Sequence, residues 1–326
     1  MRIFESKGTP NIVRNIINRI STDINKIISN KTNEVISLDI NEEVNIGKKK
    51  TLTLKCKLRL IINFSDKPGY NGNINFDTCI KSNFENCIIN IYSPYENINK
   101  LYFYKSLSHE LTHLYELYQI KDVFKKSSWK NAIALSNFDK LKLNNHRLVE
   151  YFRDIFYASL SHEIRAIVSS IEVLLIGLDT KDEDILRQEL SKTTEWSRYK
   201  ALCDFDPVVY VDDIIKEFNL DFVIRVFNLF NKMIDNKISI KNRDDLDRYF
   251  RNWKNYFTDV SEKCGIKIDN KIKEVVNGVS DDTYLLEVND DKIISYSNYL
   301  KESNNRDTKL YELLYPDYRK YFSLFL

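Results

Sequence analysis

The run His109-Glu110-Leu111-Thr112-His113 is the stretch from which the rest of the chain is interpreted. Two histidines four residues apart on a helix lie about 40° apart around the axis and about 6 Å apart along it. Both imidazoles can therefore reach one metal ion. The carboxylate of Glu110 follows the first imidazole and can reach a water molecule bound to that ion. The run predicts a metal-binding helix.

Composition makes a chance match rare. The chain has only 4 His among 326 residues. With its His and Glu residues placed at random, the expected number of His-Glu-x-x-His matches is roughly 0.003. The alternative is an ordinary amphipathic helix on which two histidines happen to align. The motif favours a metal site, and zinc is the ion that it most often binds.

The residues around the motif support a helix with two different faces. Apolar residues recur every three or four positions, at Leu107, Leu111, Leu114 and Tyr118. His109, His113 and Glu116 fall on the opposite side. Glu116 comes seven residues after His109, so the three groups would span about 10 Å along the axis. We therefore interpret Glu116 as an acceptor for a histidine N–H or as a solvated side chain, and not as a third ligand.

A catalytic zinc needs a third protein ligand and an open position for water. The residues after His113 lack the Gly and His of the extended metzincin motif. Glu163, on a predicted helix over 147–177, shares a face with apolar side chains: Phe152, Phe156, Leu160, Ile167 and Leu174. A carboxylate in such a stripe is costly unless it is paired or bound to metal. Glu163 is therefore the predicted third ligand, and the alternative is an inward Glu paired with Lys or Arg.

Side chains near Glu163 are weaker candidates. His162 lies about 100° away from that face on the helix. It could support a ligand, donate to a developing oxyanion, or be a surface histidine, and the last is favoured. Tyr157 and Arg165 are further candidates for stabilising the oxyanion. His146 is placed at a helix start and has no predicted role.

Hydrophobic periodicity predicts an α+β fold. A small N-terminal mixed or antiparallel sheet with the metal-binding helix precedes a mainly helical C-terminal part. The expected strands cover 51–64, 73–80 and 87–93, and the early helices cover 10–30 and 98–120. After a mixed polar segment at 121–146, helices are expected at 147–177, 182–202, 211–234, 243–263, 265–277, 291–302 and 308–325. Pro207 and Gly265 mark two of the breaks. The predicted domains are 1–178 and a helical domain, 179–326, packed against it.

The strand expected at 87–93 has two possible roles. It lies just before the metal-binding helix in sequence. It could be an edge strand to which an extended peptide adds as a further strand. It could equally be a plain core strand. The sequence leaves the two open.

Charge and cysteine content exclude several classes of protein. A net charge of +2 predicts neither a nucleic-acid partner nor an anionic membrane partner. The 5 cysteines include no Cys-x-x-Cys pair, which argues against a disulfide framework and a cysteine zinc knuckle. No secretory signal or transmembrane run is visible. The expected location is the cytoplasm, or a virion if the chain is phage-encoded.

Residues 85–170 resemble the gluzincin-type zinc metallopeptidases. They also resemble uncharacterised His-Glu-x-x-His proteins encoded by phages and AT-rich bacteria. The resemblance implies that His109, His113 and Glu163 bind Zn²⁺, with Glu110 as general base and then general acid. It implies a zinc-dependent peptidase acting on a peptide or protein substrate. The alternative is a catalytically silent, metallopeptidase-like structural or interaction protein, for example in a phage particle. Glu110 favours the enzyme, because a structural zinc site needs no general base.

Overall fold

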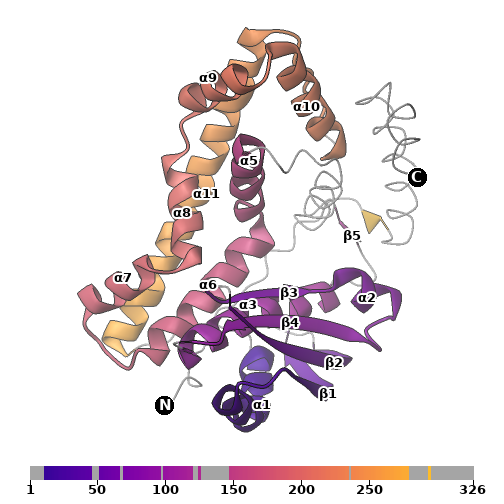
Figure 1. Ribbon diagram of the computed structural model, residues 1–326, viewed down its shortest axis with the longest axis vertical. Coiled ribbons are helices and arrows are strands. Elements are labelled where there is room, and N and C mark those ends of the chain that lie inside the picture. The colour runs from indigo at the N-terminus through magenta and orange to yellow at the C-terminus, as the bar shows by residue number, and fades with distance from the viewer. Residues whose placement is uncertain are drawn as a thin grey trace. The chain divides into compact units, whose positions relative to one another are not determined.

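The computed structural model describes residues 11–45, 51–66, 69–96, 98–119, 124–125, 147–234, 236–278 and 293–294. The chain divides into two compact units, and each is assembled from separate segments. The first unit comprises 1–121, 162–197 and 264–290, and the second comprises 122–161, 198–263 and 291–326. The elements are labelled along the chain in Figure 1. The predicted domain boundary at 178 stays a prediction.

The first unit contains a mixed four-stranded sheet. Its strands are β1 (Glu34–Asn45), β2 (Thr51–Ser65), β3 (Asn71–Ile74) and β4 (Cys87–Pro94). Their order is β1-β2-β4-β3. The β2–β4 pair is parallel, and the β1–β2 and β3–β4 pairs are antiparallel. The predicted α+β class is confirmed, whereas β1 was not anticipated.

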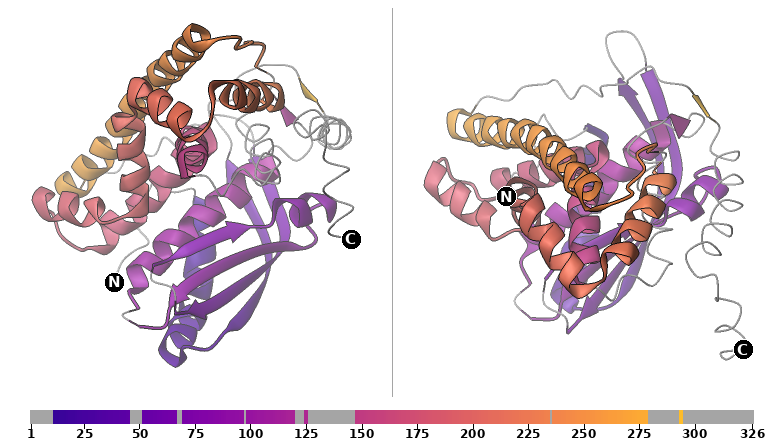
Figure 2. Two further views of the ribbon diagram at one scale, coloured as in Figure 1. Left: turned by 45° about the horizontal axis from the view of Figure 1, so that its top comes forward. Right: turned by 90° about the horizontal axis from the view of Figure 1, so that it is seen from above.

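Two helices cover one face of this sheet. Alternate residues of β2 and β4 are buried, as expected for strands with one face in a core. The helices α1 (Asn11–Asn30) and α3 (Lys100–Gln119) contact one another and the sheet (Figures 1 and 2). The α1 isoleucines recur at helical spacing and are buried, including Ile16, Ile20, Ile24 and Ile27.

The position of β4 decides between its two possible roles. β4 lies between β2 and β3, and its residues alternate between buried and more exposed positions. The edge-strand interpretation of 87–93 is therefore wrong, and this strand belongs to the sheet interior. Beside it the short strand β3 forms an end of the sheet. The strand predicted at 73–80 ends at Ile74, and α2 (Phe76–Lys81) follows it.

The remaining elements of the first unit are helical. They are α6 (Ser161–Gly177), α7 (Glu183–Ser191), the start of α8 (Thr194–Asp204) and the end of α11 (Arg243–Asn277). Asp182 caps α7 by accepting from the backbone N–H groups of Asp184 and Ile185. α6 runs antiparallel to α3. Gly177 at its end lies so close to Leu101 that an added Cβ would be 2.1 Å from the Leu101 Cδ1.

The second unit is built around aromatic side chains. It contains α5 (Arg147–Ala158), α9 (Pro207–Glu217), α10 (Leu220–Met233), most of α8, and α11 up to residue 263. It also contains two short paired strands, β5 (Phe124–Lys125) and β6 (Ile293–Ile294). The ring of Phe152 contacts those of Phe205, Tyr210, Phe227, Phe230, Phe250, Trp253 and Phe257. Such pairs strengthen a core beyond the area that they bury.

Several predicted helices have different bounds in the structure. The helix predicted at 147–177 is interrupted at Ser159 and Leu160, and those at 182–202 and 211–234 each form two helices. The break predicted at Gly265 is wrong, because α11 continues through it. The segments predicted at 121–146, 291–302 and 308–325 fall largely or wholly outside the described residues. Within the described ranges, no helix combines the length and apolar character needed to cross a membrane.

Candidate metal centre

The two predicted histidine ligands lie on α3, and the predicted carboxylate ligand lies on α6. His109 and His113 are one turn apart on α3. Glu163 lies in the first turn of α6. All three residues are buried and belong to the first unit. The antiparallel packing of α6 on α3 therefore brings together residues 50 and more positions apart in the sequence.

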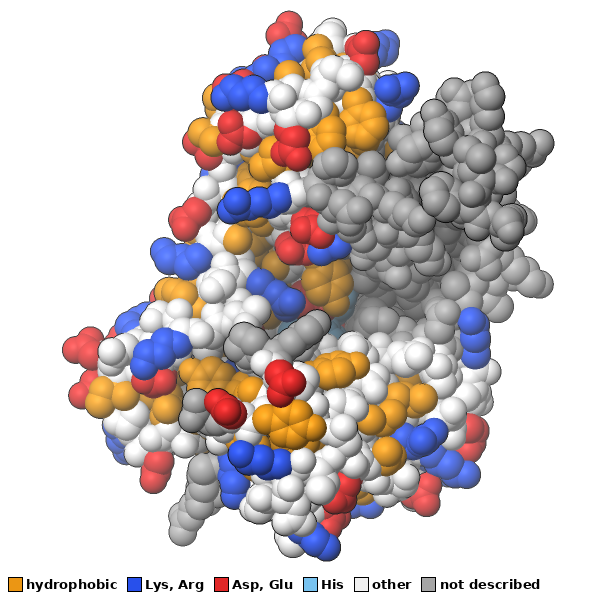
Figure 3. All heavy atoms as spheres, viewed as in Figure 1, with side chains coloured by type: hydrophobic (Ala, Val, Ile, Leu, Met, Phe, Trp, Pro, Cys, Tyr) orange, Lys and Arg blue, Asp and Glu red, His pale blue; other side chains and the backbone are white. Residues whose placement is uncertain are grey.

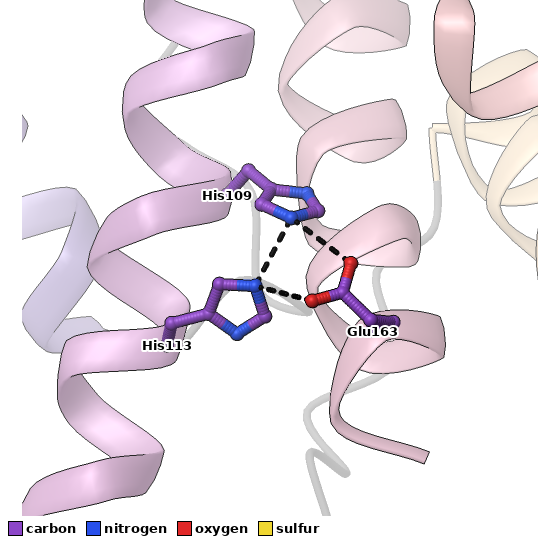
Figure 4. Close-up of side chains that lie close together, drawn as sticks. All are labelled: His109, His113 and Glu163. Carbon is purple, nitrogen blue, oxygen red and sulfur yellow. Dashed lines mark hydrogen bonds and ion pairs between the residues drawn. The ribbon is translucent and has the colours of Figure 1, made fainter. Parts of the chain in front are cut away.

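The three side chains converge on one point (Figure 4). The Nε2 atoms of His109 and His113 are 3.1 Å apart. The Glu163 carboxylate lies 3.4 Å from the His109 Nε2 through Oε2, and 3.0 Å from the His113 Nε2 through Oε1. Ligands bound tetrahedrally to one zinc ion at about 2.05 Å would be about 3.3 Å apart. Residues His109, His113 and Glu163 can therefore hold a metal ion together.

Electrostatics keep the carboxylate ionised in spite of its burial. Burial alone would raise the pKa of Glu163. The electrostatic influence of His113, together with hydrogen bonding to His109 and His113, outweighs this effect, and the pKa of Glu163 is well below its usual value. An anionic carboxylate beside two imidazole nitrogens is a donor set that suits a divalent cation.

Glu110 lies against the edge strand β3. Its side chain is 7% exposed. A Cβ added at Gly72 would be 2.7 Å from the Glu110 Cγ and 2.9 Å from its Oε1. A side chain at this point of β3 would therefore require the Glu110 side chain to shift. The strand thereby helps to position the predicted general base.

His162 is a buried neighbour of the three clustered residues. Its exposed fraction is 0%, so the surface-histidine interpretation is wrong. Its ring centroid is 5.5 Å from that of His113, and its Nε2 is 3.6 Å from the Glu163 Oε1. Burial is the main cause that lowers the pKa of His162 well below its usual value, although Glu163 opposes it. His162 is therefore a neutral imidazole beside the candidate centre.

Glu116 and Arg165 contact one another. The Arg165 Nε donates to the Glu116 Oε1, and its Nη2 lies 3.2 Å from Oε2. Glu116 is thus neither a solvated side chain nor one of the three clustered residues. Arg165 was considered for the oxyanion, and the structure places its guanidinium on Glu116. Tyr157 belongs to the second unit, and His146 lies outside the described residues.

A second buried ion pair lies one turn before His109. Lys105, on α3, donates to Glu195 in the first turn of α8. The Lys105 Nζ also lies 5.6 Å from the centre of the Tyr102 ring. Sequence reasoning missed this pair. Lys105 follows the same spacing of four as His109 and His113, but nothing in the sequence pointed to Glu195 as its partner.

The visible surface carries mixed charge. On the face shown in Figure 3, acidic and basic side chains are interspersed, in line with the net charge of +2.

Comparison of the chain with protein-family models, curated proteins and solved structures found no match. Ideas about function therefore rest on the residues of this chain. The plain conclusion is that His109, His113 and Glu163 form a buried group that could hold a metal ion.

Proposed function

We propose that the protein is a zinc-dependent peptidase, with His109, His113 and Glu163 as zinc ligands and Glu110 as general base. One observation carries the proposal. Three ligand atoms lie within 4.8 Å of one another, and a further carboxylate follows the first histidine directly on the same helix. A purely structural zinc site has four protein ligands and no use for a general base.

The chemistry of the donor set supports zinc. Two imidazole nitrogens and one carboxylate oxygen form a mixed set that zinc accepts in catalytic sites, whereas Mg²⁺ and Ca²⁺ prefer oxygen ligands. If these three residues hold a zinc ion, a further coordination position would be available for water. A bound zinc ion would lower the pKa of that water to about 7.

In this proposal Glu110 transfers a proton from the attacking water to the leaving amine. Its carboxylate accepts the proton of the attacking water and later passes it to the leaving amine. The contact with Gly72 restricts where this carboxylate can lie. The low exposure of Glu110 also limits competing bulk water.

The strand β3 supports a peptide as the substrate. It pairs with β4 on one side and ends the sheet among the described strands. An extended peptide could add to such an edge through main-chain hydrogen bonds. Gly72 places this strand directly beside Glu110, so a peptide bound there would run past the general base.

Replacing Glu110 by Gln tests the proposal. The amide is nearly isosteric but cannot accept a proton. We expect Glu110→Gln to retain one zinc per chain and the wild-type melting temperature. Its cleavage rate should fall about 10²–10⁴-fold. A peptide library digested by the zinc-loaded protein, with products identified by mass spectrometry, supplies the measurement.

The matched control is Glu262→Gln, the same change at an exposed position of α11. It should cleave like wild type. Cleavage by Glu110→Gln at the control rate would contradict the general-base role. Zinc binding without cleavage of any library peptide would instead favour the silent structural protein.

A further inference from the structure

We propose that Glu116 and Arg165 are a positioning pair that holds Glu163 at the metal centre. The inference rests on the metal site used in the proposed function, but not on peptidase activity. Glu116 comes three residues after His113, and Arg165 comes two residues after Glu163. The pair thus links the two ligand-bearing helices immediately beside their ligands.

Glu163 needs such support because of its place in α6. It lies in the first turn of that helix, and the chain just before the helix is interrupted at Ser159 and Leu160. Helix ends fray more readily than helix centres. A ligand must nevertheless stay within about 0.2 Å of the bond length that zinc requires. An anchor two residues further into the helix meets this need.

Other contacts between α3 and α6 bring the two helices close together. Near the far end Gly177 packs against Leu101 without a side chain of its own. In the middle, the Ser169 hydroxyl lies 3.1 Å from those of Ser108 and Thr112. Small side chains and freely rotating hydroxyls allow close approach.

The ion pair has the directional geometry that these contacts lack. Two guanidinium nitrogens of Arg165 meet the two carboxylate oxygens of Glu116, which is the two-pronged arrangement that fixes orientation as well as distance. The Glu116 side chain is only 2% exposed. Its carboxylate is therefore shielded from water that could replace the guanidinium.

The ion pair between Glu172 and Lys271 serves as a comparison, because it joins α6 to a helix that carries no residue of the candidate metal centre. Glu172 is on α6, nine residues beyond Glu163, and lies 3.6 Å from the Lys271 Nζ of α11. That partner helix carries none of the three clustered residues. Breaking this pair should destabilise α6 without moving its first turn. Lys271→Met is accordingly the matched control for a change at Glu116.

The test is metal affinity, measured for Zn²⁺ by competition with a chromophoric chelator. Glu116→Gln should bind Zn²⁺ about 10–100-fold more weakly than wild type, the range found when groups supporting metal ligands are removed. Arg165→Lys keeps the charge but loses the two-pronged contact, so its Zn²⁺ affinity should lie between those of wild type and Glu116→Gln. The Zn²⁺ affinity of Lys271→Met should stay within about twofold of wild type, even if its melting temperature falls as much as that of Glu116→Gln.

A spectrum separates positioning from stability. With Co²⁺ in place of Zn²⁺, the visible absorption of wild type and Lys271→Met should coincide, and that of Glu116→Gln should change in shape or intensity. If Glu116→Gln does not fold, the comparison of Arg165→Lys with Lys271→Met decides. Equal affinities and spectra in these variants would overturn the positioning role while leaving the peptidase proposal intact. Absence of metal binding by wild type would overturn both.

Discussion

At the scale of single residues, Gly72 leaves the space that the Glu110 side chain fills. Its backbone lies where any side chain would meet Glu110. Its φ is not in the left-handed region, so a substitution here acts through the space beside Glu110 and not through backbone conformation. Gly72→Ala therefore changes the site without straining the strand.

We expect Gly72→Ala to displace the Glu110 carboxylate and to lower the cleavage rate about 10²-fold, the order of loss that a misplacement of about 1 Å can cause. Zinc affinity should remain that of wild type, because the three ligands are untouched. Steady-state kinetics and zinc titration measure the two effects. Asn73→Ala, at an exposed position of the same strand, serves as the control. Equal loss in both variants would show that the space beside Glu110 is not the cause.

Single residues show which parts of the candidate site could be predicted from the sequence alone. The spacing of His109 and His113 is a local helical property, so it predicted two adjacent nitrogens without any knowledge of the fold. Glu163 was selected because it shares a face with apolar residues on one long helix. That helix is interrupted at Ser159 and Leu160, where the Ser159 hydroxyl donates to the Phe156 carbonyl. Phe152 is buried as expected, but among the aromatic rings of the second unit.

At the scale of elements, the pair Lys105–Glu195 ties α8 to α3. Burial would raise the pKa of Glu195, but the charge of Lys105 and its hydrogen bond lower it overall. A carboxyl group whose pKa is lower in the folded state stabilises the fold above its unfolded pKa. That contribution is lost as the pH falls through the folded pKa.

Glu195→Gln should therefore lower the free energy of unfolding by about 3–5 kcal/mol at neutral pH, because it leaves the buried ammonium of Lys105 without its counter-charge. The difference from wild type should begin to shrink near pH 4.5 and should disappear as the pH falls through the lower pKa of the folded carboxyl, because the wild-type carboxyl then also becomes neutral. Urea unfolding across this pH range gives both values. Glu189→Gln breaks an exposed pair with Lys192 and should lower the free energy of unfolding far less. A difference that is independent of pH would refute the assignment.

Element boundaries were harder to predict than element types, and particular residues show why. Pro207 starts α9 because its ring suits the first helical position and Asp206 caps that end. Gly265, by contrast, lies inside α11, where the continuing helix outweighs a cost of about 1 kcal/mol relative to alanine. The ion pairs at Glu116 and Lys105 could not be predicted, because each joins residues that only the fold brings together.

At the scale of the whole molecule, the first unit draws on three separated segments of the chain. A fragment ending at the predicted boundary of 178 would lose α7, the start of α8 and the end of α11, and with them Glu195, the partner of Lys105. We expect fragment 1–178 to lack cooperative thermal unfolding and to bind zinc at least 10-fold more weakly than the full chain. Fragment 1–278 keeps these elements and is the control. Full zinc affinity in the shorter fragment would support the predicted boundary.

Because the first unit is built from three separated segments, its parts become available one after another during synthesis. The sheet and both histidines emerge from the ribosome first, Glu163 follows about 50 residues later, and the last segment begins at residue 264. At about 5–20 residues per second, the interval between residues 121 and 264 lasts about 7–30 s. During this interval, apolar residues of the first unit stay exposed, because the segment from residue 264 that completes the unit has not yet been synthesised. We therefore expect the chain to depend on chaperones during translation and to bind the proposed metal ion only near the end of synthesis.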